Sequence, residues 1–272
     1  MRIAVPATSV LWFFNPHSDY GTASDAMEKY RTLEENSALN GGLEILLLPR
    51  KLRSIDDFDP WFNTAFSRLR HRSVHIGDAD EHFLAGADGM TGKLELLAEI
   101  MERMGADRIV VHASHLLRDR MRKREILQKI FPRTTVLVEN NGWDSAEGSS
   151  PEVLSDIFRD CPKFQLCLDV CHTMDCFGDY LPKTFTSMPE LMERIGQIHF
   201  SCSMAKYPED SYAVKGFTGY IPGHALWSVI GESPHPDLMM FVERYPVVLE
   251  GVQPPEDHSL NYLKNELMLF EK

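Results

Sequence analysis

The chain has 272 residues, of which 43% are hydrophobic, and its formal net charge is −12. This length and composition allow a sizeable buried core and exclude a low-complexity or intrinsically disordered chain. The acidic balance argues against a general nucleic-acid coat, which needs basic surface, and no apolar run is long enough to span a bilayer.

Short apolar segments typical of β-strands recur along the chain, with helical segments between most of them. We expect strands at 2–5, 43–48, 73–76, 108–112, 135–139, 164–170, 195–200 and 246–250. We expect helices at 24–38, 59–69, 91–104, 117–130, 150–160, 187–194 and 256–271. The less regular, proline-containing region 203–235 is expected to form an extended active-site loop with a short helix.

Eight strands alternating with helices over this length predict an α/β fold, a (β/α)8 TIM barrel, with residues 1–272 as a single barrel domain. The alternative is a doubly wound open sheet. No G-x-G-x-x-G motif follows the first strand, so the main reason to prefer the open sheet is missing.

The N-terminal sequence "MRIAVPATSV" lacks the long apolar core and the cleavage site of a signal peptide, so we expect a cytoplasmic protein without a membrane partner. The stretch "FQLCLDVCHTMDCFG" at 164–178 combines a strand pattern with an acid, a histidine and three cysteines. Its C-x3-C-x4-C spacing matches no zinc or iron–sulfur pattern, so we expect reduced, packing thiols rather than a disulfide or a thiolate metal site. Cys167 and Cys171 are expected to face away from the barrel axis.

Polar side chains close six consecutive strands of the predicted barrel. In a TIM barrel the C-terminal strand ends form the catalytic face, so these side chains are expected to point into one site. They are His75, His112, Glu139, Asp169, His199 and Glu250, and His172 follows Asp169 closely.

Three carboxylates and several imidazoles on one axis indicate a divalent metal, because carboxylates gathered without a cation repel one another. Mixed imidazole and carboxylate ligands suit zinc, manganese, iron or cobalt better than magnesium or calcium. We expect one or two ions per chain, with zinc or manganese favoured.

Four motifs, "VLVENN", "CLDVCHT", "IHFSCS" and "VVLEG", occur in this order at the strand ends, and "VVHASHLL" precedes them. Together they resemble the xylose isomerase-like TIM-barrel superfamily, which joins endonuclease IV with sugar isomerases and epimerases. The resemblance covers roughly residues 70–255. It implies a metal quartet of Glu139, Asp169, His199 and Glu250. It also implies that His75 and His112 bind a second metal bridged by Glu139, and that His172 is a nearby ligand or acid/base.

The sequence departs from the endonuclease IV pattern in two places. The run "KGFTGYIPGHALW" contains no Asp-x-His for a third metal, and Ile76-Gly77 stands where a proline usually follows the third-strand histidine. His224 in this run is expected to contact substrate, the alternative being that it replaces a missing ligand.

Three functions remain open at this point. The favoured one is isomerisation or epimerisation of a small sugar, polyol or related compound through a metal-chelated enediolate, with Glu139, Glu250 or His172 moving the proton. The second is metal-dependent phosphodiester hydrolysis at DNA abasic sites, as the resemblance to endonuclease IV implies. The third is a barrel that binds a ligand without catalysis.

Two basic runs, "PRKLR" at 49–53 and "RDRMRKR" at 118–124, follow the second and fourth predicted strands. Arg50, Arg53, Arg118 and Arg120 would then lie near the catalytic face, where they are expected to bind an anionic group of the substrate, with Arg50 and Arg118 favoured. The expected partner is therefore a small anionic or polyhydroxylated molecule, and nucleic acid is less favoured. The sequence does not fix the oligomeric state.

Overall fold

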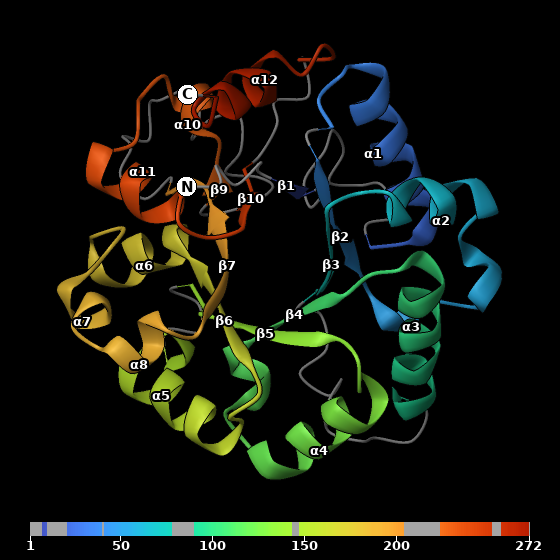
Figure 1. The fold of residues 1–272 in the computed structure, drawn as a ribbon, viewed down its shortest axis with the longest axis horizontal. Coiled ribbons are helices and arrows are strands. Elements are labelled where there is room, and N and C mark those ends of the chain that lie inside the picture. Colours follow the sequence, from blue (N-terminus) through green and yellow to red (C-terminus); the bar gives the residue numbers. More distant parts are fainter. Residues whose placement is uncertain are drawn as a thin grey trace.

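Eight parallel strands close into a barrel in the computed structural model of the protein (Figure 1). The structure describes residues 7–9, 21–39, 41–77, 90–142, 147–203, 224–251 and 257–271. Around the barrel the strand order is β1-β10-β7-β6-β5-β4-β3-β2. Their bounds are β1 Ala7–Ser9, β2 Gly42–Leu47, β3 His71–Ile76, β4 Arg108–His112, β5 Thr135–Glu139, β6 Gln165–Asp169, β7 Ile195–Phe200 and β10 Val247–Leu249. The predicted α/β TIM barrel is thereby confirmed.

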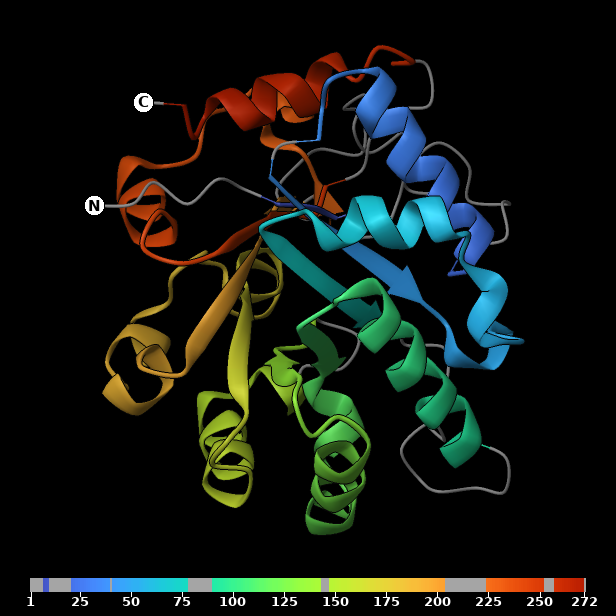
Figure 2. The same ribbon diagram turned by 45° about the vertical axis from the view of Figure 1, so that its right-hand side comes forward.

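Helices form a ring outside the strands, and the ring closes where α12 approaches α1 at the top of the view (Figures 1 and 2). The α-helices are α1 Ala23–Glu35, α2 Pro60–Ser67, α3 Met90–Met104, α4 Arg120–Ile130, α5 Pro151–Asp160, α6 Val170–Phe177, α7 Lys183–Thr186, α8 Pro189–Met192, α10 Trp227–Ile230, α11 Pro236–Val242 and α12 Asn261–Met268. Short 3-10 turns occur at η1 Pro49–Lys51, η2 Ile55–Asp57 and η3 Ala113–Leu116. A small antiparallel sheet pairs β8 Cys202–Ser203 with β9 His224–Ala225.

Side chains along each strand alternate between two cores. Val136 and Val138 of β5 belong to the large core that the helices cover, whereas Leu137 packs with Val110 and Cys167 in a separate cluster inside the barrel. Successive strand residues face opposite sides of a sheet, so Glu139 lies on the same inner side as Leu137. This alternation points the polar strand-end residues inward.

The observed elements agree with most of the expected ranges. The first expected strand, 2–5, lies outside the described residues, and the described first strand is Ala7–Ser9. Of the expected helix at 187–194, only the short helix α8 at Pro189–Met192 is present, and the short helix α7 at Lys183–Thr186 precedes the expected range. Helix α6, which begins directly after β6, was not expected. Its Asp169 carboxylate caps the first turn by accepting from the His172 N–H.

Prolines begin several of the helices that return the chain along the outside. Pro60, Pro151, Pro189 and Pro236 occupy the first turns of α2, α5, α8 and α11. Proline fits this position because its fixed φ is already helical and the N–H that it lacks would have no partner within the helix. Helices α2 and α5 therefore start within one residue of the expected positions 59 and 150, whereas α11 was not expected from sequence.

No described helix is both long and apolar enough to cross a membrane.

A phenylalanine cluster fixes α2 against the barrel and α1. Phe58, Phe62 and Phe66 are fully buried, with ring centroids 5.2 Å apart for the first pair and 5.6 Å for the second. Tyr30 of α1 meets the edge of Phe62 at 5.5 Å. Their spacing of four residues places the rings on one helical face, directed at the core.

We expect Phe62→Ala to lower the free energy of unfolding by about 3–5 kcal/mol, because it removes a large buried ring and leaves a cavity. Chemical denaturation measures this change. Met240→Ala, at a side chain that is 60% exposed, serves as the control and should change the value by less than about 0.5 kcal/mol. Equal effects of the two substitutions would contradict the packing described here.

Candidate metal centre

The carboxyl ends of four neighbouring strands bring two glutamates, an aspartate and a histidine together inside the barrel. One ligand atom from each residue lies within 4.8 Å of every other, and all four side chains are buried. We call Glu139, Asp169, His199 and Glu250 the quartet. Strand register explains the convergence, because Asp169 pairs with His199 across β6 and β7, and Glu250 directly follows β10.

The ligand atoms of the quartet lie close together around His199 Nδ1. His199 Nδ1 lies 3.2 Å from Glu139 Oε1, 2.5 Å from Glu250 Oε2 and 4.0 Å from Asp169 Oδ2. Asp169 Oδ2 has no hydrogen-bond partner among the described residues, and the nearest donors to Glu139 Oε2 and Glu250 Oε2 are imidazole nitrogens of His75 and His199, at 3.1 Å and 2.5 Å. Buried acid oxygens without donors are costly unless a cation binds them. The donor set therefore fits a divalent ion, although the role of these residues as ligands stays a prediction.

The electrostatics of the quartet favour the same interpretation. Burial raises the pKa of Asp169 to about 6, and the nearby glutamates add to this shift. Burial also opposes ionisation of Glu139, but the surrounding imidazoles, His199 first, hold the pKa of its carboxyl well below its usual range. Burial alone would lower the pKa of His199, yet the neighbouring acidic groups raise it well above its usual value. Positive charge is thus strongly favoured at this point of the barrel.

His75 and His112 contact the other oxygen of Glu139 from the one that His199 contacts. Their Nε2 atoms lie 3.1 Å and 3.5 Å from the same oxygen, Glu139 Oε2, and their ring centroids are 4.9 Å apart. With Glu139 they form a second group in which one ligand atom from each residue lies within 4.8 Å of the others. The structure therefore brings together the three side chains predicted to share a second metal.

His172 and His224 form a hydrogen-bonded pair beside Asp169. His172 Nδ1 lies 2.6 Å from the Asn140 carbonyl oxygen, which can only accept, so this nitrogen carries a proton. The two Nε2 atoms are 3.1 Å apart, and Ser201 Oγ lies 3.0 Å from His224 Nδ1. The predicted acid/base residue thus contacts the residue predicted to contact substrate, a pairing that sequence did not indicate.

The basic runs are only partly directed at the site. Arg50 and Arg118 are exposed residues in the loops after β2 and β4, and their contact with substrate stays a prediction. Arg120 instead pairs with Asp160 of α5 at 3.5 Å. Lys123 is buried and donates to the His115 carbonyl oxygen at 2.7 Å. Arg120 therefore links α4 to α5, and Lys123 links α4 to the 3-10 turn η3 after β4.

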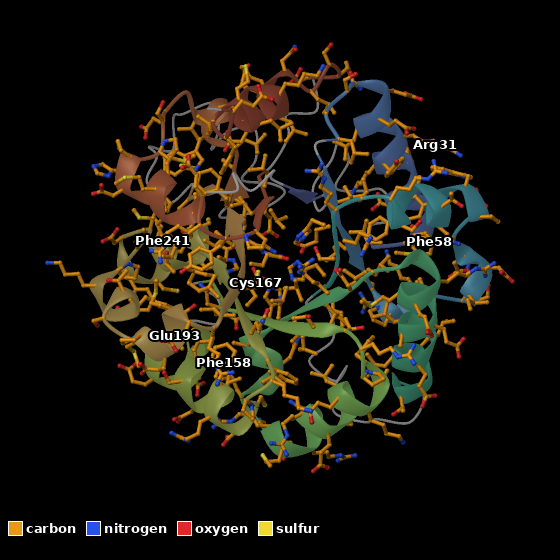
Figure 3. All side chains as sticks on the ribbon, viewed as in Figure 1. Arg31, Phe58, Phe158, Cys167, Glu193 and Phe241 are labelled. Atoms are coloured by element: carbon orange, nitrogen blue, oxygen red, sulfur yellow. The ribbon has the colours of Figure 1, made fainter. Side chains whose placement is uncertain are left out.

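Cys167 lies inside the barrel, so the expectation that it faces away from the axis is wrong. Figure 3 shows it at the centre of the ring of strands, and its Sγ is 3.6 Å from Gln197 Nε2. With a period of two, residues 167 and 169 share one face of β6. None of the five cysteines, all of which the structure describes, forms a disulfide, as expected, and burial raises the pKa of the Cys167 thiol far above its usual value, which keeps it protonated.

Glu44 of β2 is a site residue that the sequence analysis missed. It is completely buried, and its Oε1 lies 3.0 Å from His199 Nε2 and 3.8 Å from His75 Nδ1. Burial opposes its ionisation, but His199 and His75 outweigh that effect and lower the pKa of Glu44 to about 2. A charged residue within the apolar run "LEILLL" was the available signal, and it was overlooked because it does not close the strand.

The sequence matches no protein-family profile and no curated protein sequence. Solved structures are nevertheless similar over almost the whole chain. The probable 3-DHS dehydratase AsbF from Bacillus anthracis is 14% identical, with a TM-score of 0.63 and 98% of each chain covered. A xylose isomerase-like TIM-barrel protein from Mycobacterium smegmatis, solved with magnesium, is 13% identical, with a TM-score of 0.57 and coverage of 98% of this chain and 96% of that one.

D-psicose 3-epimerase from Clostridium cellulolyticum H10, solved with D-tagatose, is 13% identical, with a TM-score of 0.54 and coverage of 97% of this chain and 96% of that one. At such identities the likeness concerns the fold. The order of strands, the closed barrel and these neighbours agree with the resemblance in the strand-end motifs. The chain has the fold of the xylose isomerase-like TIM barrels.

Proposed function

We propose that the protein is a divalent-metal-dependent isomerase or epimerase of a small polyhydroxylated compound, such as a sugar, a polyol or a phosphorylated relative. The observation that carries this proposal is the buried quartet of three carboxylates and one imidazole, which lies beside the His172–His224 pair. The site combines groups that bind a cation with groups that can move a proton. Isomerisation and epimerisation at a carbon next to a carbonyl need both.

Glu139, Asp169, His199 through Nδ1, and Glu250 would hold the ion. Three carboxylates and one imidazole suit zinc or manganese. When bound, the ion would polarise two adjacent substrate oxygens and stabilise the negative charge that develops when a proton leaves the carbon between them.

The chain's own residues would carry the protons. Glu139 Oε2 and Glu250 Oε2 are buried and lie beside imidazole nitrogens of His75 and His199, which suits a carboxylate that exchanges a proton with a carbon. Burial opposes protonation of His172, but Asp169 and Glu139 outweigh it and raise the pKa of its imidazole. His172, backed by His224, would therefore deliver a proton to a substrate oxygen.

The neighbouring structures support a small substrate. One is named an epimerase of the sugar D-psicose and another a probable 3-DHS dehydratase, and both share the whole fold with this chain. The net charge of −12 also argues against a polyanion such as DNA as the usual partner.

Phosphodiester hydrolysis, including cleavage at DNA abasic sites, is the second candidate. It is favoured by one observation, the approach of His75 and His112 to the same Glu139 oxygen. A second ion there would share Glu139 with the first, an arrangement suited to in-line displacement at phosphorus. The number of ions per chain separates the two candidates.

We expect zinc or manganese to bind about tenfold more weakly at pH 5 than at pH 7. A proton on Asp169, whose pKa is raised to about 6, competes with the ion, so affinity is present above this value and falls below it. Competition with a chromophoric chelator across this range measures the effect. A metal affinity that does not change with pH would argue against Asp169 as a ligand.

Elemental analysis of the same samples should give about one ion per chain for the isomerase and two for the hydrolase.

We expect Glu139→Gln and Glu250→Gln each to abolish turnover, because each removes a negative charge from the ion and a proton carrier. His112→Ala should cost less than about tenfold if one ion suffices. Incorporation of solvent deuterium into a panel of ketoses and polyols, followed by NMR, measures the reaction. His235→Ala, at a histidine with a side chain 73% exposed, is the matched control and should leave the rate unchanged.

The opposite pattern would favour hydrolysis. In that case an abasic-site duplex or a simple phosphodiester is cleaved, and His112→Ala loses the cleavage together with one metal ion per chain. This outcome would overturn the isomerase proposal.

A further inference from the structure

An asparagine directly after β5 joins the strand end that carries Glu139 to the strand end that carries Asp169. Asn140 is completely buried, and its side chain has no role in the site described so far. We infer that Asn140 is a positioning residue, which fixes the Asp169 carboxylate relative to Glu139 so that both face the same ion. The inference rests on the metal site of the proposed function and adds to it a residue outside the quartet.

The Asn140 amide makes two hydrogen bonds to the backbone of a single residue. Its Oδ1 accepts from the Asp169 N–H at 2.8 Å, and its Nδ2 donates to the Asp169 carbonyl oxygen at 3.0 Å. A backbone N–H only donates and a backbone carbonyl only accepts, so these two contacts allow one orientation of the amide. Two hydrogen bonds to one residue restrict its rotation as well as its position.

The amide takes the place of a strand partner where β5 and β6 separate. Backbone pairing between these strands ends at Glu139, which lies opposite Cys167. Asp169 lies two residues further along β6, and on its other side it pairs with His199 of β7. The Asn140 side chain therefore continues the hydrogen bonding between β5 and β6 beyond the last backbone pair, and Asp169 is held from both sides.

The main chain of Asn140 holds a second group of the site. Its carbonyl oxygen lies 2.6 Å from His172 Nδ1, and the backbone N–H of His172 donates to Asp169 Oδ1 at 2.8 Å. Asn140, Asp169 and His172 are thus bonded to one another around the first turn of α6. Asp169 Oδ2 is the oxygen that remains for the quartet, 4.0 Å from His199 Nδ1. A shift of Asn140 would therefore change the direction of this oxygen.

The next residue makes the same kind of contact in the other direction. Asn141 Oδ1 accepts from the Ser114 N–H at 2.7 Å, and Asn141 Nδ2 donates to Ser114 Oγ at 3.1 Å. Ser114 lies in η3, which follows the strand that carries His112. Asn140 thus binds a quartet residue, whereas these side-chain hydrogen bonds of Asn141 go to the segment after β4. The two neighbouring asparagines can therefore be compared directly.

Repulsion between the acids is the reason why the position of Asp169 needs support. Glu139 and Asp169 are both buried, and like charges at short distance favour conformations in which the carboxylates turn apart. Asn140 opposes this movement because it ties the backbone of Asp169 to the residue that follows Glu139. Loss of a residue that hydrogen-bonds a metal ligand typically weakens metal binding by about 10–100-fold.

The test compares Asn140→Ala with Asn141→Ala and with the unaltered protein. The two variants are matched, because each removes a buried amide and the two hydrogen bonds that it makes to an adjacent segment. Zinc affinity is measured by chelator competition. We expect Asn140→Ala to bind zinc about tenfold more weakly than the unaltered protein, whereas Asn141→Ala keeps the affinity within about twofold.

A second readout reports on the arrangement of the ligands. The visible absorption bands of the cobalt-loaded protein should shift or weaken in Asn140→Ala and stay unchanged in Asn141→Ala. If Asn140→Ala does not fold, Asn140→Gln takes its place, because its longer side chain keeps an amide but not the position of that amide. If the unaltered protein binds two ions per chain, all variants are compared in the His112→Ala background, which lacks the second ion.

Equal zinc affinities of the Asn140 and Asn141 variants, whether unchanged or reduced together, would overturn the inference, because a general loosening of the strand ends would affect both. An unchanged cobalt spectrum in the Asn140 variant would also overturn it. Failure of the proposed metal site looks different, since the unaltered protein would then bind neither zinc nor cobalt, and both proposals would be refuted. Neither readout depends on whether the protein is an isomerase or a hydrolase.

Discussion

Electrostatic repulsion among buried carboxylates is the constraint on which the rest of this barrel depends. Glu44, Glu139, Asp169 and Glu250 all lie around one imidazole and are removed from water. Such a concentration of negative charge is stable only when positive charge is bound at its centre or when some of the acids are protonated. The raised pKa of Asp169 and the raised pKa of His199 are two responses of the protein to this need, and a bound divalent ion would be a third.

The barrel distributes this charge unevenly along its interior. One side carries Val110, Leu137 and Cys167, which pack together without charge. The other side carries the hydrogen-bonded set of Glu44, Ser73 and Gln197. These hydrogen bonds link β2, β3 and β7 beside the histidine of the quartet.

Sequence predicted the barrel and the inward strand ends well, because both follow from simple periodicities. A strand that closes in Glu139 or Asp169 after apolar residues must direct that acid to the barrel mouth once its outer face is packed by helices. The same rule, applied consistently, would also have placed Cys167 inside. Glu44 was not predicted because it lies within its strand, and only residues at strand ends were taken as candidates for the site. The contact between His172 and His224 was not predictable, since it depends on how the small sheet of β8 and β9 returns the chain to the site.

The start of helix α6 has a bearing on which ions the quartet can accept. Asp169 uses Oδ1 to accept the His172 N–H at 2.8 Å, so only Oδ2 is left to face the other quartet atoms. Because one lone pair of Oδ1 is used for this hydrogen bond, Asp169 would bind an ion more readily through Oδ2 alone than through both oxygens. Calcium, which takes six to eight oxygens and often uses carboxylates with both oxygens, is poorly served by such a site. Smaller ions that take fewer ligands would not be affected in this way. The hydrogen bond at the N-terminus of α6 would therefore favour smaller ions over calcium at the quartet.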